Sequence, residues 1–270
     1  LSCWLADQTI ATNDSYKLLQ MQRDGVPEQR ITIVRNGPTE EQLRPVTPLD
    51  TLMQPSKITL GYVGVLGSQD GLDYLLRALR HLVDDFGKTD FFCWILGDGD
   101  AMHDLKTLTK KLNLEEHVGF TGWIPQDDVL HHLAAVDICV DPDPSNPYND
   151  RSTMIKMMEY MTLEKPIVAF DLPEHRVSAG DAAVYARGND ELDFARNIVL
   201  LMDDPDLRRQ MGQAGNERVK TELAWEYQAK RLLDAYRKLG TRTPNNDSDT
   251  HNDTDGAPLE EVRAEHVDTV

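Results

Sequence analysis

The sequence predicts an α/β protein in which a doubly wound parallel sheet carries helices on both faces. Between residues 57 and 203, short apolar runs alternate with helix-like stretches. Strands that alternate with helices need crossover connections, and these put helices on both faces of an open parallel sheet. With 40% hydrophobic residues, the 270-residue chain can bury a core of this size. Ligands of such sheets bind beyond the carboxyl ends of the strands.

One α/β unit and a linker precede this repeat. The unit has a predicted short strand and its loop at 8–14, a predicted helix at 15–24 and a second predicted strand at 30–35, which Asn36-Gly37-Pro38 closes. The stretch from Pro38 to Pro55 holds four prolines and little periodicity, which is typical of a linker between domains. A domain boundary is therefore expected within this stretch.

The repeating region begins at Lys57. Its apolar runs predict strands at 58–65, 91–97, 117–122, 136–142, 166–171 and 182–186. Helices are predicted near 71–85, 101–113, 126–135, 152–163 and 190–203, and two more at 205–219 and 222–238. The residues after 240 are rich in Asn, Asp, Thr and Ser and cannot offset the entropy of ordering. The predicted division is residues 1–40 as the end of a first domain, 41–56 as a linker, 57–240 as the main domain and 241–270 as a disordered acidic tail.

Charge and cysteine content narrow the classes of function. A formal net charge of −18 repels phosphate backbones and anionic lipid, so nucleic acid is not an expected partner. Cys93 and Cys139 lie in apolar strand-like runs and Cys3 is far from both in sequence, which indicates a reducing compartment. No run approaches the length of a membrane span. The first residues read as the middle of a protein, so we expect an upstream domain and a cytoplasmic chain.

Three glycine-bearing loops follow the first three strands of the repeat. Without a Cβ, glycine lets a ligand approach the backbone, and the helix that follows directs its positive end at the same point. The second loop fails the dinucleotide fingerprint because Met102 stands where a third glycine is needed. For each loop the alternative is an ordinary turn between strand and helix. The candidate binding residues are Gly64, Gly67 and Gly71, then Gly97 and Gly99, then Gly122, Trp123 and Ile124.

Two further polar patterns receive no metal-binding role. Asp141-Pro142-Asp143 resembles the Asp-x-Asp pair that holds a divalent metal, and hard oxygen ligands suit such an ion. The intervening proline restricts the convergence of the two carboxylates, so we predict a solvated turn and no metal. His131 and His132 are adjacent on a predicted helix and point about 100° apart, which excludes an i, i+4 ligand pair. Nothing in the sequence resembles a nucleophile elbow.

The strongest candidate is the segment from Asp150 to Glu159. Ser152 and Thr153 are expected to open a helix at the carboxyl edge of the sheet, where free amides and the helix dipole favour a diphosphate. Glu159 lies seven residues after Ser152, on nearly the same helix face and roughly 10 Å along the axis. A carboxylate there can accept two hydrogen bonds from vicinal ribose hydroxyls. The alternative is a surface Glu159 paired with Lys156.

These motifs together resemble the retaining GT-B-fold glycosyltransferases of family 4, the group 1 type. The resemblance runs from about residue 5 to 238, on the segments "VRNGP", "YVGVLGSQDGLDYLLRAL", "ILGDGD", "VGFTGWIP" and "MMEYMTLEKPIVAFD". It implies two Rossmann-like domains facing a cleft, with the acceptor bound mainly by the first and the nucleotide-sugar donor by the second. The chain would hold the end of the first, acceptor-binding domain and the whole donor-binding domain.

The resemblance also implies an activity and residue roles. Glu159 would bind the ribose, the backbone of Gly122–Ile124 the base, and the amides around Ser152–Met154 the donor phosphates or sugar. The implied reaction moves a sugar from a nucleotide sugar, with UDP as the expected nucleotide, to a hydroxyl acceptor with retention and without a protein nucleophile, a metal or another cofactor. The implied acceptor is a lipid-linked or cell-surface glycan, with peripheral contact to the inner face of the membrane through the upstream domain.

The chain departs from the family's pattern where the phosphates are expected. The acidic residue usually found eight positions before the helical Glu is Arg151 here, with Asp150 beside it, and the usual Arg and Lys of the first loop are Val65 and Asp70. Because a leaving diphosphate develops negative charge, we hypothesise that Arg151, Lys156 or both replace the lost cations. Two alternatives stay open: a GT-B-like sugar-nucleotide epimerase, and a nucleotide-sugar-binding module without catalysis.

Overall fold

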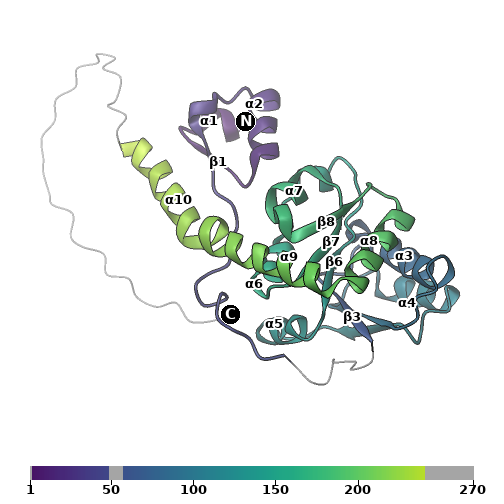
Figure 1. The fold of residues 1–270 in the computed structure, drawn as a ribbon. Helices are drawn as coiled ribbons and strands as arrows, with labels where there is room; N and C mark the ends of the chain where they lie inside the picture. The colour runs from purple at the N-terminus through teal and green to yellow at the C-terminus, as the bar shows by residue number, and fades with distance from the viewer. Residues whose placement is uncertain (1, 49–56, 241–270) are drawn as a thin grey trace, which may run out of the picture.

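The fold is a six-stranded parallel sheet covered by helices, with a small α/β module beside it (Figure 1). A computed structural model describes residues 2–48 and 57–240. The predicted linker residues 49–56 and the predicted tail 241–270 lie outside the described residues. The strands of the large sheet are β3 (Ile58–Val63), β4 (Phe91–Leu96), β5 (Val118–Gly122), β6 (Ile138–Asp141), β7 (Ile167–Phe170) and β8 (Ala183–Ala186).

The strand order places a topological switch point in the middle of the sheet. The order is β5-β4-β3-β6-β7-β8 and every pairing is parallel. The chain therefore builds outward in one direction from β3 and then, from β6, in the other. Loops that leave the carboxyl ends of β3 and β6 diverge and open a crevice at the sheet edge. The predicted doubly wound sheet is confirmed.

Two apolar layers fix the helices on the two faces of the sheet. Large buried side chains of α3, α4 and α8 pack with Leu60, Tyr62 and Phe91 on one face. On the other face, α5, α6 and the segment after α9 pack with Leu96, Cys139 and Ile167. The helices of this domain are α3 (Leu72–Asp84), α4 (Met102–Lys111), α5 (Gln126–Ala134), α6 (Ile155–Thr162), α7 (Pro173–Ala179), α8 (Glu191–Asp203) and α9 (Pro205–Arg218), with shorter turns η3 (Ser68–Asp70), η4 (Asn149–Arg151), η5 (Gly180–Ala182) and η6 (Val219–Leu223).

Helix α6 is anchored to both strands of the switch point by one buried tyrosine. The Tyr160 hydroxyl accepts a hydrogen bond from the amide of Val63, at 3.1 Å, and donates one to the carbonyl of Val140, at 3.3 Å. These residues belong to β3 and β6, so the tyrosine holds the helix across the crevice. The polar face of α6 is thereby directed at the space between the two diverging loops.

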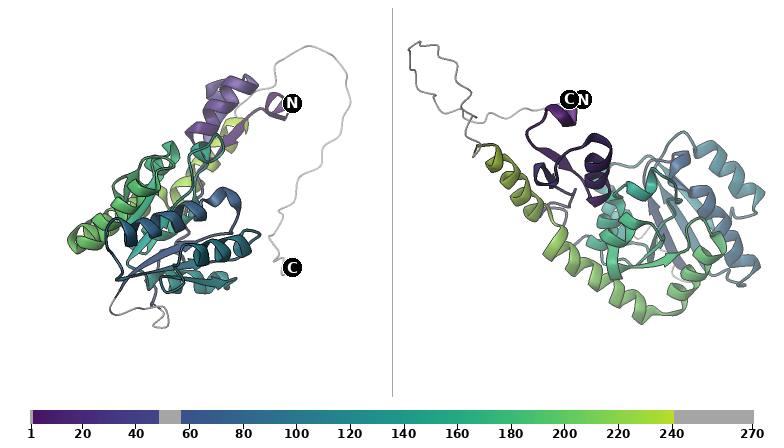
Figure 2. Two further views of the ribbon diagram at one scale, coloured as in Figure 1. Left: turned by 90° about the vertical axis from the view of Figure 1, so that its right-hand side faces the viewer. Right: turned by 90° about the horizontal axis from the view of Figure 1, so that it is seen from above.

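The small module consists of a two-stranded parallel sheet and its helices. Its elements are α1 (Ser2–Leu5), β1 (Thr9–Ala11), α2 (Asp14–Asp24), η1 (Glu28–Arg30) and β2 (Ile31–Ile33). Figures 1 and 2 show it set off from the large sheet, with α10 (Trp225–Gly240) running alongside. The side chain of Gln228 in α10 accepts a hydrogen bond from the amide of Arg35, at 3.0 Å. The last helix thus packs against the module that begins the chain.

Two sequence predictions about helices were wrong. The helix expected from Ser152 begins at Ile155, because Asn149–Arg151 form a separate 3₁₀ turn and the chain from Ser152 to Met154 is extended. Helix α7 was not predicted, since it has only seven residues, beginning at Pro173, which are too few to show a period. None of the helices within 2–48 and 57–240 combines the length and apolar character that a membrane span requires.

Candidate functional site

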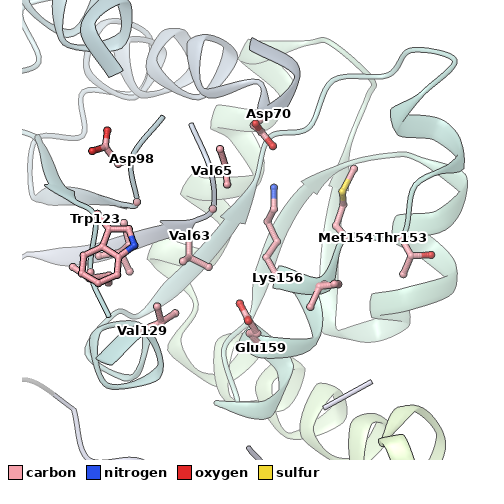
Figure 3. A pocket seen from close by; sticks show the side chains of 15 residues that line it. Val63, Val65, Asp70, Asp98, Trp123, Val129, Thr153, Met154, Lys156 and Glu159 are labelled. Atoms are coloured by element: carbon pink, nitrogen blue, oxygen red, sulfur yellow. The ribbon is translucent and has the colours of Figure 1, made fainter. Parts of the chain in front are cut away.

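A cavity of about 460 Å³ opens at the switch point, beyond the carboxyl ends of β3 and β4 (Figure 3). This volume is within the range of small-molecule sites. The loops after β3, β4 and β5 form one side, and α6 with the residues just before it forms the other. Its lining residues are Val63, Gly64, Val65, Asp70, Leu96, Gly97, Asp98, Trp123, Ile124, Val129, Thr153, Met154, Ile155, Lys156 and Glu159.

The floor on the strand side depends on the close approach of two loops. Gly64 donates its amide to the carbonyl of Leu96, at 3.1 Å, and the amide of Leu66 donates to the carbonyl of Asp98, at 3.0 Å. A Cβ on Gly97 would lie 2.0 Å from the carbonyl oxygen of Gly64, and Gly97 has a φ of 133°. Only glycine lets the two loops meet in this way. The predicted glycine at 97 is therefore required by the backbone itself.

An apolar wall lies at the end of the cavity farthest from Thr153. Trp123 and Ile124 follow β5, and Val129 lies on α5. The side chain of Trp123 is 75% exposed although it is large and apolar, and it stands at the rim of the cavity in Figure 3. An exposed aromatic ring beside a cavity offers a flat surface for a planar ligand group.

Glu159 supplies a partly buried carboxylate on the cavity side of α6. Figure 3 shows its carboxyl group below Lys156, on the same helix. Burial raises the pKa of Glu159 above the ordinary value of 4.5, and the nearby Lys156 only partly offsets this. A desolvated carboxylate gains by accepting hydrogen bonds, so the group is suited to a ligand with paired hydroxyl donors.

Lys156 places a buried ammonium between the cavity and the end of β6. Its Nζ lies 2.9 Å from Oδ2 of Asp143 and 3.4 Å from Oδ1 of Asp141, and it stands over the ring of Tyr62. The predicted solvated turn at Asp141-Pro142-Asp143 is wrong, because both carboxylates are buried and converge on this lysine. The two carboxylates therefore face the same point, the ammonium of Lys156.

The charged groups of this cluster shift one another's pKa values. Burial raises the pKa of Asp141, but the charge of Lys156 together with Asp143 and His175 outweighs it and holds that pKa at about 2. Burial and the charge of Asp141 raise the pKa of Asp143 well above its usual range. Burial would lower the pKa of Lys156, but the two aspartates keep it well above the ordinary value. The lysine is therefore a permanently charged group within reach of the cavity.

A second cavity, of about 280 Å³, lies between the small module and the large domain. It adjoins the first, since both are lined by Asp70, Thr153 and Met154. Asn149 is buried and leaves its Oδ1 without a hydrogen-bond partner. The remaining lining is mainly hydroxyl, amide and carboxylate groups: Thr12, Tyr16, Asn36, Gln69, Asp143, Tyr148, Asn149 and Ser152.

Polar contacts hold the module against this second cavity. The Nδ2 of Asn13 donates to the carbonyl of Arg151, at 2.7 Å, and to the hydroxyl of Thr153, at 2.9 Å. Glu174, which is 2% exposed, accepts a hydrogen bond from the Ser15 hydroxyl, at 2.6 Å, and pairs with Arg35, at 3.4 Å. The loop before α6 is therefore positioned partly by the first residues of the chain.

The structure brings together about half of the residues singled out in the sequence. Arg151 is exposed, lines neither cavity and donates to the carbonyl of Pro147, at 2.7 Å. Asp150 accepts from the Ser145 hydroxyl, at 3.0 Å. Ser152 lines the second cavity only. Gly67 and Gly99 line a neighbouring cavity, and Gly71 and Gly122 line none of these three. The residues that line the main cavity as expected are Gly64, Gly97, Trp123, Ile124, Thr153, Met154, Lys156 and Glu159.

Sequence reasoning missed the residues that come from a distance. His175 joins the cluster around Lys156 from α7, and Asp143, which the sequence had assigned to a solvated turn, joins it from the loop after β6. Asn13, Thr12 and Tyr16 reach the second cavity from the small module. For Asp143 a signal existed, since aspartates directly after a buried strand lie at the ligand edge of a parallel sheet. No local pattern marks the others.

The chain matches known proteins over most of its length. Residues 57–204, more than half of the chain, match the family described as "Glycosyl transferases group 1". The lipopolysaccharide core biosynthesis glycosyltransferase LpsD of Rhizobium meliloti is 25% identical over 214 residues, which are 78% of this chain and 57% of that protein. The putative glycosyltransferase EpsD of Bacillus subtilis is 27% identical over 218 residues, 77% of this chain and 54% of that protein.

Solved structures agree on the fold. The crystal structure of Anabaena HepE in complex with UDP superposes with a TM-score of 0.76 at 15% identity, covering 88% of this chain and 65% of that one. Staphylococcus aureus TarM, in a complex that includes UDP, gives a TM-score of 0.73 at 16% identity, covering 87% of this chain and 45% of that one. This chain spans about half the length of the curated relatives it matches.

Proposed function

The chain belongs to the group 1 glycosyl transferases, and from that premise we propose that its switch-point cavity binds a nucleotide-sugar donor, with UDP as the nucleotide. One observation carries the proposal: α6 presents Glu159 and Lys156 to the same cavity, three residues apart and so roughly 4.5 Å apart along the axis. A carboxylate for hydroxyl donors and a cation for phosphate, at this spacing, suit a ribose and its attached diphosphate.

The remaining walls suit the other parts of the donor. The base stacks at Trp123 and pairs with backbone at Ile124, at the apolar end of the cavity. The diphosphate lies at the start of α6, where the free amides and the helix dipole attract an anion. The sugar then points toward the second cavity, whose hydroxyl and amide groups suit a polyhydroxyl ring.

The proposed reaction is transfer with retention of anomeric configuration. The bond from the anomeric carbon to the phosphate oxygen breaks, and the bond to the acceptor oxygen forms on the same face, while the acceptor proton passes to the leaving phosphate. Lys156 stabilises the negative charge that develops on the diphosphate. We assign this role to Lys156 rather than Arg151, because Lys156 lines the cavity and Arg151 does not.

We infer the acceptor and the cellular location from the descriptions of the relatives. LpsD is described as acting in lipopolysaccharide core biosynthesis, and this supports a hydroxyl of a lipid-linked or cell-surface glycan as the acceptor here. We place the chain in the cytoplasm, at the inner face of the membrane, where such acceptors are made. Its free thiols at Cys3, Cys93 and Cys139 support a reducing compartment.

A nucleotide panel tests the donor site on this chain directly. At 100 times its dissociation constant, UDP should add about 2.7 kcal/mol to the free energy of unfolding, measured by thermal denaturation. UDP-sugars should do the same, ADP and GDP at the same concentration should add less, and Glu159→Ala should reduce the UDP effect to roughly half or less. Equal stabilisation by all three nucleotides, or an undiminished UDP effect in Glu159→Ala, contradicts the proposal.

A second candidate is a nucleotide-sugar-binding module without catalysis. It is favoured by Asp70, whose carboxylate lines both cavities close to the position proposed for the phosphates. The complete natural protein separates the two functions. Release of UDP together with a glycosylated product supports the transferase, and tight donor binding without either product supports the module. Isomerised UDP-sugar would indicate an epimerase.

A further inference from the structure

Three buried side chains with acceptor atoms lie next to Lys156, where the loop after β6 meets α7. Asp141, Asp143 and His175 each offer a ligand atom, and these atoms lie within 4.8 Å of one another. All three side chains are buried, at 0%, 1% and 0% exposure. The first two come from the end of a switch-point strand and the third from the first turn of α7.

The histidine is held in the orientation and tautomer of a ligand. Its Nδ1 lies 2.9 Å from the carbonyl oxygen of Phe170, which can only accept, so Nδ1 carries the proton. In the neutral ring Nε2 then keeps its lone pair. That atom has no hydrogen-bond partner and lies 3.9 Å from Oδ2 of Asp141. A backbone carbonyl that fixes one ring nitrogen while the other binds is the usual arrangement at metal sites.

The group has more acceptors than donors. Lys156 donates to Asp143, at 2.9 Å, and to the Tyr62 hydroxyl, at 3.5 Å. Oδ2 of Asp141 and Nε2 of His175 are buried without a hydrogen bond, and Oδ1 of Asp141 has only the ammonium of Lys156, at 3.4 Å. Buried lone pairs without donors are costly. One ammonium leaves this cost in place, whereas an ion bound by both residues would remove it.

We propose that Asp141, Asp143 and His175 form a site for a divalent transition-metal ion such as Zn²⁺ or Mn²⁺, and that the ammonium of Lys156 occupies this position when no ion is bound. Two carboxylates and one neutral imidazole balance the charge of such an ion, and this mixed set of ligands suits Zn²⁺ and Mn²⁺ better than Mg²⁺. Ligand atoms about 2.1 Å from a common ion are separated by roughly 3 to 4 Å. The three side chains therefore need to close by roughly 1 Å or less.

The ion and the ammonium exclude each other. Lys156 Nζ already lies within 3.4 Å of both aspartates, so an ion enters only when the lysine withdraws. The lysine stem lines the donor cavity and has space to withdraw into it, and Asp143 lines the second cavity, which gives the ion a route. Figure 3 shows the ammonium directed across the cavity toward Asp70. Binding of the ion thus moves a positive charge toward the place proposed for the phosphates.

Equilibrium dialysis of this chain with Zn²⁺ alone, after treatment with a chelator, tests the site without any assay of transfer. The expected result is one ion per chain. Asp143→Asn and His175→Ala should each weaken binding at least tenfold, and His131→Ala, which removes a half-buried histidine on α5 outside this group, should leave it unchanged. Lys156→Met should tighten binding at least tenfold, because the competing ammonium is gone.

The Lys156→Met variant keeps the proposal falsifiable if His175→Ala does not fold, which thermal denaturation will show. Less than a tenth of an ion per chain in the wild type overturns the proposal. So does a Lys156→Met variant that binds Zn²⁺ no more tightly than the wild type, or binding that is lost equally with His131→Ala. None of these outcomes depends on whether UDP binds, so the donor-site proposal and the metal-site proposal can be contradicted independently.

Discussion

The two ends of the donor cavity are built on different principles. At the end proposed for the base and ribose, the walls are backbone loops, an exposed tryptophan and the carboxylate of Glu159. At the end proposed for the phosphates, Lys156 stands among Asp70, Asp141 and Asp143. Among the described residues that line the two cavities, Lys156 is the only lysine or arginine. Recognition at the first end rests on shape and hydrogen bonding, and at the second on a single cation.

Removing Lys156 tests this contrast most severely. In the complete natural protein, Lys156→Met should lower kcat roughly 100- to 1,000-fold, because one preorganised charge at a developing anion has an effect of this size. Steady-state kinetics with the preferred UDP-sugar measure it, and Lys110→Met, at an exposed position on α4, is the matched control. A change of less than threefold would show that another cation serves the phosphates.

Glu159 should matter for the nucleoside rather than for its phosphates. On this chain, Glu159→Gln should weaken both uridine and UDP by roughly 10- to 100-fold, since hydrogen bonds to a charged acceptor are lost. Lys156→Met should weaken UDP and leave uridine nearly unchanged. Isothermal titration calorimetry provides the four comparisons, with the exposed Glu115→Gln as control. If Glu159→Gln affected UDP and not uridine, the assignment of the two ends would be reversed.

Acidic pH should lower the affinity for uridine by up to tenfold per pH unit. The ribose hydroxyls need the ionised carboxylate, and burial raises the pKa of Glu159 above 4.5 in the free protein. Affinity for uridine should therefore be constant above that raised pKa and fall as the pH drops through it. Titrations across this range measure the effect, and Glu159→Gln should remove the dependence. A dependence that persists in this variant assigns it to another group.

Arg151 should give the smallest effect. Its guanidinium is exposed and donates to the carbonyl of Pro147 on its own loop. Arg151→Ala should change kcat and the affinity for UDP by less than about twofold, as is usual for surface substitutions away from a site. The same titrations and kinetics check this. A loss comparable with that of Lys156→Met would mean that the loop before α6 turns Arg151 inward when the donor binds.

The sequence was sufficient to predict the sheet, because its signals are local. Each strand of the large domain lies in a short apolar run, and each loop after the first three strands contains glycine, so the order of elements could be read residue by residue. Glu159 was found in the same way, from its place on a helix at the ligand edge of the sheet. Gly97 was singled out for ligand contact, and the structure adds that the loop of Gly64 leaves no room for a Cβ.

The charged cluster could not be predicted, because it depends on contacts between distant segments. His175 meets Asp141 only through the packing of α7, which is too short to show a period. The convergence of Asp141 and Asp143 depends on the path of the backbone around Pro142, which the residue types do not specify. Arg151 and Lys156 were equal candidates in the sequence. Because the helix begins three residues later than expected, Arg151 lies outside the cavity and Lys156 lines it.

The polar contact between the small module and the loop before α6 has a calorimetric consequence. Asn13, Ser15 and Arg35 of the module meet Arg151, Thr153 and Glu174 of the large domain through hydrogen bonds and an ion pair. Separation of such groups exposes little apolar surface, and the heat-capacity change of an opening follows the apolar area exposed. A hinge motion at this contact would therefore leave almost no signature in a calorimeter, and amide exchange at Ser15, whose N–H donates to Glu174 across the contact, would report it instead.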